Sequence, residues 1–109
     1  MSLIMITTNQ AVTQPCREIF KALADETRWL IVKELLGRPQ TVGELAERLS
    51  VSHYNISKHL KVLREINILV MNKEGRHVRA RVNPAMEPKS SPGEGRAKVL
   101  ELGFCEIRF

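Results

Sequence analysis

Two predicted helix starts only eleven residues apart are the feature of this chain that most constrains its fold. Thr41 and Glu44 have the spacing of a capping box, in which the side chain of each residue bonds the backbone amide of the other. The helix that they open is short, because residues 50–51 leave room for a tight connection only. Ser52 then has the position of an N-cap for a longer helix over residues 53–66. A short helix, a tight turn and a longer helix indicate a helix-turn-helix.

Two further helices are expected before this pair. Pro15 is a favourable residue for a first helical turn, and the helix that it begins runs to about residue 24. Asp25 predicts an N-cap for the next helix, over residues 26–36, which Gly37 ends. The apolar residues that predict the buried faces of these two helices are Ile19, Phe20, Leu23, Trp29, Val32, Leu35 and Leu36.

A two-stranded hairpin is expected after the longer helix. Asn67 can adopt the left-handed conformation that ends a helix, and residues 68–71 have the composition of a strand. Residues 72–75 predict a turn, and residues 77–82 return with strict alternation of apolar and polar side chains. The apolar face of the returning strand consists of Val78, Ala80 and Val82, and its polar face consists of His77, Arg79 and Arg81.

The whole chain divides into four predicted segments. Residues 1–14 are expected to be an N-terminal arm, and residues 15–83 a winged helix-turn-helix DNA-binding domain. Residues 84–97 are rich in proline, serine and glycine, which is typical of a linker. Residues 98–109 are rich in apolar and β-compatible residues and predict one last strand. The expected fold class is mainly α with a small β-hairpin, an α+β winged helix-turn-helix.

The positive charge of the chain is confined to one part of this arrangement. Seventeen lysines and arginines against twelve acidic residues give a net charge of +5. Residues 52–82 hold seven of the basic residues and two of the acidic ones, which accounts for the whole surplus. A surplus confined to one helix and one hairpin predicts a face that binds a polyanion.

Double-stranded DNA is the polyanion that such a helix and hairpin fit. The major groove admits one α-helix, which must be apolar on its anchored side and polar on the side that reads the bases. Ile56, Leu60 and Leu63 provide the anchor. The predicted DNA-binding residues are Ser52, His53, Tyr54, Asn55, Ser57, Lys58 and Lys61 on the helix and Lys73, Arg76, His77 and Arg79 on the hairpin.

Several of these side chains have a chemically suitable partner on a duplex. Asn55 can pair with the edge of an adenine, and Tyr54 can contact a thymine methyl group or a phosphate. Lys58 and Lys61 can neutralise the backbone or contact guanine. The basic hairpin can follow a phosphate strand or enter the minor groove. Direct readout by the helix and backbone contact by the hairpin are therefore expected.

Three stretches of the sequence form a recognisable combination. They are residues 20–28 (Phe-Lys-Ala-Leu-Ala-Asp-Glu-Thr-Arg) followed by an aliphatic run, residues 49–65, and the turn at residues 74–77. Together they resemble the opening signature, the recognition helix and the wing of ArsR-type bacterial transcriptional repressors. The resemblance implies a homodimer that represses an operator with two-fold symmetry and is often released from it by a metal or another ligand.

The resemblance does not extend to the metal sites of that family. Its metal-sensing version has a cysteine motif at the position of residues 42–46, which are Val-Gly-Glu-Leu-Ala here. A second metal site uses a carboxy-terminal dimerisation helix, whereas the corresponding region here is the predicted linker at residues 84–97. The usual glycine after the recognition helix is Asn67. DNA binding is therefore expected with no metal site and no cofactor, and any effector is an unknown small molecule.

Three features outside the predicted reading surface have open interpretations. Cys16 and Cys105 are ordinary reduced thiols, a redox pair that bridges within or between subunits, or part of a soft-metal site shared across a dimer. Leu30 is an isolated surface leucine or part of a dimer interface with the first helix and the terminal strand. His59 lies beside the apolar anchor and is expected to be half-buried rather than to contact a base.

Other classes of function have weaker support in the sequence. The alternative to a DNA-binding regulator is a winged helix that docks on an acidic protein partner. An enzyme is not expected, because the sequence has no glycine-rich phosphate loop and no nucleophile beside a base. No apolar run approaches the length of a membrane span, and the first residues lack the basic flank of a signal peptide. A cytoplasmic protein without a membrane partner is expected.

Overall fold

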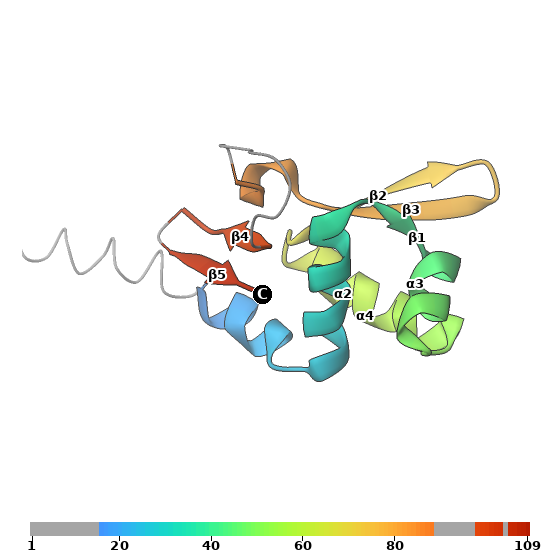
Figure 1. Ribbon diagram of the computed structural model, residues 1–109, viewed down its shortest axis with the longest axis horizontal. Coiled ribbons are helices and arrows are strands. Elements are labelled where there is room, and N and C mark those ends of the chain that lie inside the picture. Colours follow the sequence, from blue (N-terminus) through green and yellow to red (C-terminus); the bar gives the residue numbers. More distant parts are fainter. Residues whose placement is uncertain (1–15, 89–97, 104) are drawn as a thin grey trace, which may run out of the picture.

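The computed structural model describes residues 16–88, 98–103 and 105–109. It has the expected α+β winged helix-turn-helix architecture (Figure 1), and no helix among these residues is long and apolar enough to cross a membrane. The predicted arm at residues 1–14, the helix start at Pro15 and residues 89–97 of the predicted linker lie outside the described residues. In chain order the elements are the first helix (residues 16–23), α2 (Glu26–Gly37), β1 (Gln40–Thr41), α3 (Val42–Leu49), α4 (His53–Glu65), β2 (Leu69–Glu74), β3 (His77–Val82), the 3-10 helix η1 (Pro84–Met86), β4 (Val99–Glu101) and β5 (Glu106–Arg108).

The predicted N-caps of α2 and α4 are confirmed. Asp25 Oδ1 accepts a hydrogen bond from the backbone N–H of Arg28 at 3.1 Å. This bond is the main reason why the pKa of Asp25 is lowered. Ser52 Oγ accepts a hydrogen bond from the backbone N–H of Asn55 at 3.1 Å. Both helices therefore begin where the local sequence provides an acceptor for an otherwise unpaired amide.

The predicted capping box of α3 is complete, and its removal has a measurable cost. Thr41 N–H donates to Glu44 Oε1 at 2.8 Å, and Glu44 N–H donates to Thr41 Oγ1 at 3.1 Å. Thr41→Ala removes the side-chain acceptor and is expected to lower the free energy of unfolding by about 1 kcal/mol. Urea denaturation followed by circular dichroism measures this loss, with Thr27→Ala as the matched control within α2. Equal losses in the two variants would contradict a specific role of the cap.

Residues in the left-handed conformation close the turns at both ends of α4. Ser50, which ends α3, has a φ of 56°, and its N–H bonds the carbonyl of Ala46. Asn67 has a φ of 67°, as predicted for a residue that replaces glycine after the helix. The N–H of Ile68 then donates to the carbonyl of Leu63 at 3.0 Å. These bonds fix the direction in which the chain enters and leaves α4.

The wing sheet has three strands in the order β1-β3-β2, and both pairings are antiparallel. The turn predicted at residues 72–75 was wrong, and the strand predicted at residues 68–71 was too short. Strand β2 continues to Glu74, and the chain reverses at Gly75 and Arg76. Gly75 has a φ of 62°, which glycine adopts without a steric penalty. Pairing with β3 keeps residues 72–74 extended although their local composition favours a turn.

The two-residue strand β1 was not predicted. Gln40 is fully buried and lies opposite Ala80 of β3. Its Nε2 donates hydrogen bonds to the backbone carbonyl and to the carboxylate of Glu34, both at 3.2 Å. Because Gln40 contacts α2 through its side chain and β3 through its backbone, it ties the base of the wing to the helical part of the domain.

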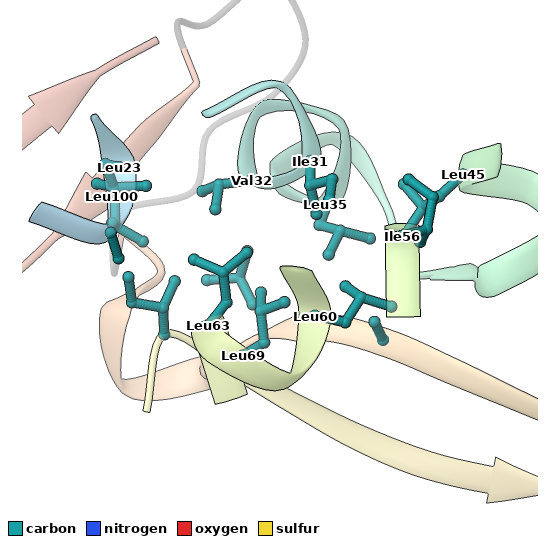
Figure 2. Close-up of a cluster of buried hydrophobic side chains, with 14 of the residues drawn as sticks. Leu23, Ile31, Val32, Leu35, Leu45, Ile56, Leu60, Leu63, Leu69 and Leu100 are labelled. Atoms are coloured by element: carbon teal, nitrogen blue, oxygen red, sulfur yellow. The ribbon is translucent and has the colours of Figure 1, made fainter. Parts of the chain in front are cut away.

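The buried core lies between the helices and the sheet (Figure 2), and the face of α2 that it uses differs from the prediction. Ile31 is fully buried, although it was not predicted to be. Trp29 and Leu36 were predicted to be buried and are half-buried, and Phe20 of the first helix is 47% exposed. Six apolar residues between positions 29 and 36 do not define a single face, so only tertiary packing selects the buried stripe.

The C-terminal residues form a hairpin, which corrects the single strand predicted for residues 98–109. Strands β4 and β5 pair antiparallel with Leu100 opposite Ile107. Gly103 lies between them with a φ of 90°, a conformation that favours glycine. Leu100 is fully buried and belongs to the same apolar cluster as Leu23 of the first helix (Figure 2). The hairpin therefore packs on the helical part of the domain.

The segment predicted as a linker begins with regular structure. Residues 84–86 form the 3-10 helix η1, and Asn83 Oδ1 accepts a hydrogen bond from the N–H of Ala85 at 3.0 Å. The amide of the same Asn83 side chain donates to the carbonyl of Asn67 at 2.9 Å. The exit of β3 is thereby tied to the end of α4.

Candidate nucleic-acid interface

Helix α4 has one buried face and one exposed face, as predicted. Ile56, Leu60 and Leu63 have no exposed surface and anchor the helix in the core (Figure 2). The residues predicted to contact DNA from this helix are all exposed, namely Ser52, His53, Tyr54, Asn55, Ser57, Lys58 and Lys61. Ser52 Oγ already accepts the N-cap hydrogen bond. The other side chains in this set, from His53 onward, do not take part in that cap.

Tyr54 and Lys58 form a pair on the exposed face of α4. Tyr54 is 71% exposed, so its ring is not part of the core. Lys58 Nζ lies 5.4 Å from the centre of that ring, within the range of a cation–π interaction. The two residues are one helical turn apart. The ring therefore restricts the positions of the ammonium group on this surface.

His53 lies against the start of α3. A β-carbon placed on Gly43 of α3 would be 3.6 Å from His53 Cε1, an ordinary van der Waals distance. The imidazole thus covers the first turn of α3 and remains exposed to solvent. The first turns of the two helices of the helix-turn-helix consequently lie close together, and a partner that contacts His53 also approaches α3.

Arg28 of α2 connects the first helix to α4. Its Nη1 donates a hydrogen bond to the carbonyl of Ala22 at 3.0 Å. Its Nε donates a hydrogen bond to His59 Nδ1 at 3.1 Å. His59 is half-buried, as predicted, and this contact gives it a partner within the domain. One guanidinium group therefore contacts two other helices at a point behind the exposed face of α4.

The wing carries two basic residues and one histidine on its exposed part. Lys73, Arg76 and His77 are all exposed. Figure 1 shows the β2-β3 hairpin projecting away from the helices. Arg76 is in the turn, whereas Lys73, which was predicted at the tip, lies within β2. The end of the wing thus presents positive charge at a distance from the core.

Arg79 differs from the other predicted contact residues, because two carboxylates hold its guanidinium group. Arg79 Nε lies 3.0 Å from Glu74 Oε1, and Arg79 Nη1 lies 3.6 Å from Glu44 Oε1. These contacts raise the pKa of Arg79, with Glu74 making the largest contribution. Glu44 is also the acid of the capping box, and the backbone N–H of Thr41 is the main reason why its pKa is lowered. Arg79 therefore joins the wing to the start of α3.

The acidic partners in the wing were missed from the sequence. Glu74 pairs with His77, so Arg79 is its diagonal neighbour across the β2-β3 ladder. The proximity of Glu74 and Arg79 follows from the register of β2 and β3. The predicted turn at residues 72–75 left Glu74 outside the strand, so this register could not be derived. Arg81 is likewise paired, with Glu87 Oε1 at 3.3 Å from its Nη2. Two of the seven basic residues between positions 52 and 82 are therefore partly neutralised.

Comparison with known proteins gives consistent matches to this part of the chain. Residues 25–69, which include α2, α3 and α4, match the family model described as bacterial regulatory protein, arsR family. The transcriptional repressor SdpR of Bacillus subtilis (strain 168) is 33% identical over 60 residues, which cover 55% of this chain and 67% of SdpR. The HTH-type transcriptional regulator YceK of the same organism is 34% identical over 73 residues, which cover 65% of this chain and 73% of YceK. The structure of an ArsR-like transcriptional regulator from Rhodococcus sp. RHA1 matches with a TM-score of 0.63 and 39% identity, over 69% of this chain and 71% of that one.

Proposed function

The chain belongs to the arsR family of bacterial regulatory proteins and is a transcriptional regulator, and we propose that it acts as a repressor that binds an operator of two-fold symmetry as a homodimer. The observation that carries this proposal is the exposed polar face of α4 beside a basic wing. A face of this kind fits the major groove, while the wing can reach the flanking phosphates.

Helix α4 is the proposed reading helix. Asn55 is exposed near its start, where its amide can make two hydrogen bonds to an adenine edge. Lys58, which the Tyr54 ring restrains, is one turn further and can contact a phosphate or guanine. The buried anchor of α4 supports this role, because a helix held in a fixed position does not have to be ordered on binding.

The wing is proposed to contact the phosphate backbone. Lys73 and Arg76 are exposed and have no carboxylate partner among the residues that the structure describes. Phosphate contacts position a protein on the duplex and carry no sequence information by themselves. We therefore assign sequence preference to α4 and a general contribution to affinity to the wing.

A second copy of the chain is proposed to cover two exposed apolar side chains. Phe20 of the first helix is 47% exposed, and Leu30 of α2 is 37% exposed. A homodimer would present two reading helices to half-sites about 34 Å apart along the duplex. Light scattering at tens of micromolar protein tests the assembly, with Leu30→Lys as the variant expected to shift it toward the monomer. A wild-type chain that is monomeric under these conditions would overturn the proposed dimer.

Selection from a pool of random duplexes by the purified chain tests the function and needs no operator of known sequence. The expected result is an enriched sequence with two related half-sites, bound at least about 10³-fold more tightly than a scrambled duplex of the same composition. An absence of any enriched sequence, together with binding that does not respond to salt, would favour the protein-interaction module instead.

Arg76 and Arg79 are expected to differ in their effect on DNA binding. Arg76→Ala removes an unpaired charge at the wing turn and is expected to weaken binding about tenfold. Arg79→Ala is expected to weaken binding by less than about threefold, because Glu74 and Glu44 engage the Nε and Nη1 groups that a direct phosphate contact would use. Fluorescence anisotropy with the selected duplex at one salt concentration measures both variants. The reverse order of effects would contradict the proposed roles.

A further inference from the structure

The two cysteines of the chain lie far apart in the sequence but on elements that are neighbours in the fold. Cys16 is the first described residue of the first helix, and Cys105 comes directly before β5. Figure 1 shows β5 beside the start of that helix. Both residues are half-buried, and neither is in a disulfide. The two cysteines therefore belong to neighbouring elements, and each retains some exposure to solvent.

Packing around β5 maintains this arrangement. Ile107 packs against the buried cluster that includes Ile19 and Leu23 of the first helix. The Phe109 ring lies 4.2 Å from the Trp29 ring, measured between their centres. These contacts hold β5 and the C-terminal residue against the helical part of the domain.

Backbone bonds fix Cys105 within the hairpin. The carbonyl of Cys105 accepts a hydrogen bond from the N–H of Leu102 at 2.9 Å, and the N–H of Phe109 donates to the carbonyl of Lys98 at 2.8 Å. Cys105 thus lies directly before β5, at the end of the β4-β5 ladder where the chain turns near Gly103.

The electrostatics of Cys105 are consistent with this arrangement. Burial is the main cause that raises the pKa of Cys105, and negative charge on Cys16 is the next. Glu101 and Glu106 raise the pKa of Cys105 further. A charge on one sulfur therefore contributes to the pKa of the other, which agrees with the neighbouring positions of β5 and the first helix.

We propose that Cys16 and Cys105 are a reversible disulfide site, at which peroxide joins the first helix to the C-terminal hairpin within one chain. Two thiols without further ligands favour a disulfide over a metal site. Among the described residues, no group of three or more histidine, cysteine or acidic side chains could hold a metal ion. The proposal does not depend on the DNA-binding function, since neither cysteine lies on α4 or the wing.

The reaction uses hydrogen peroxide as the oxidant and balances without another reagent. The thiolate sulfur of one cysteine attacks a peroxide oxygen, the O–O bond breaks, and hydroxide leaves, which gives a sulfenic acid. The thiolate of the second cysteine attacks that sulfur, the S–S bond forms, and the S–O bond breaks with loss of a second hydroxide. The two thiol protons convert the hydroxides to two molecules of water. Two electrons pass from the sulfur pair to the peroxide.

The bridge is expected to stabilise the folded chain. It would close a loop of about 90 residues and so reduce the conformational freedom of the unfolded chain. The midpoint of thermal unfolding is expected to rise by about 10 °C on oxidation and to fall back when the disulfide is reduced. Formation of the bridge should be faster at pH 9 than at pH 7, because the raised pKa of Cys105 leaves little thiolate at neutral pH.

Mass spectrometry of the full-length protein tests the site. Reduced protein is treated with hydrogen peroxide, and the expected product is a monomer about 2 Da lighter, with a linked peptide pair that contains Cys16 and Cys105. A covalent dimer as the main product would overturn the proposal. Products that carry only added oxygen, without loss of hydrogen, would also overturn it.

Cys16→Ser and Cys105→Ser are the matched control variants. Neither should lose 2 Da, and neither should gain thermal stability on oxidation. If both variants fail to fold, the mass and peptide mapping of the wild-type chain still decide the question. A sulfur-to-cadmium charge-transfer band that requires both cysteines, with no bridge formed by peroxide, would assign the pair to metal binding and overturn the disulfide site.

Discussion

Raising the sodium chloride concentration from 50 to 200 mM is expected to weaken binding of the selected duplex by about 10³–10⁵-fold. This size of effect corresponds to roughly 6–10 phosphate contacts shared by two subunits, each of which releases condensed counterions when it forms. We expect the exposed basic residues of α4 and the wing, which carry the charge surplus of the chain, to make these contacts. Fluorescence anisotropy at a series of salt concentrations gives the slope.

Two variants separate the electrostatic part of binding from base readout. Arg76→Ala should reduce the slope of log K against log salt by about one for each phosphate that the arginine neutralises. Asn55→Ala removes no charge, so it should leave that slope unchanged and reduce the preference for the selected duplex over a scrambled one by about 5- to 150-fold. Identical behaviour of the two variants on both duplexes would contradict the division between α4 and the wing.

Leu60→Ala is expected to lower the free energy of unfolding by about 2–5 kcal/mol. Leu60 lies in the middle of α4 with no exposed surface, and the cavity left by truncation is enclosed by the core. A domain of this size has a total stability of roughly 5–15 kcal/mol, so the variant loses a large fraction of it. Denaturation in urea followed by circular dichroism measures the difference.

Lys61→Ala is the control for the core substitution, because it is the next residue along the helix and is exposed. Its free energy of unfolding should remain within about 0.5 kcal/mol of the wild type. Leu60→Ala should lower the free energy of unfolding without changing the charge of the exposed face of α4. Lys61→Ala should reduce that charge and leave the free energy of unfolding nearly unchanged. A Leu60→Ala variant within about 1 kcal/mol of the wild type would contradict the structure of the core.

The helices were predictable because their starts depend on local chemistry. Asp25, Thr41 and Ser52 each provide a side-chain acceptor for an amide within the next three residues, and all three caps are present in the structure. The exposed face of α4 was also predictable, because the periodicity of Ile56, Leu60 and Leu63 fixes the opposite face. Short-range rules therefore account for the framework of the candidate site.

The features that were missed depend on contacts between distant residues. Strand β1 exists because Gln40 pairs with β3, and β2 is extended because Glu74 pairs with His77. Glu44 could be predicted as a partner of Arg79 only if the position of α3 against the wing were known. The C-terminal hairpin could be predicted only if Gly103 were recognised as a turn residue within an apolar stretch. None of these relations has a signature within one short window of sequence.

The contact of Arg28 with both Ala22 and His59 has a mechanical consequence. The first helix and α4 share one rigid, planar guanidinium group, so a displacement of the first helix is transmitted to the reading helix through two hydrogen bonds. A lysine at this position would keep the charge but not the fork of fixed donors. Position 28 therefore couples the two helices, so the orientation of α4 within the domain depends on the packing of the first helix.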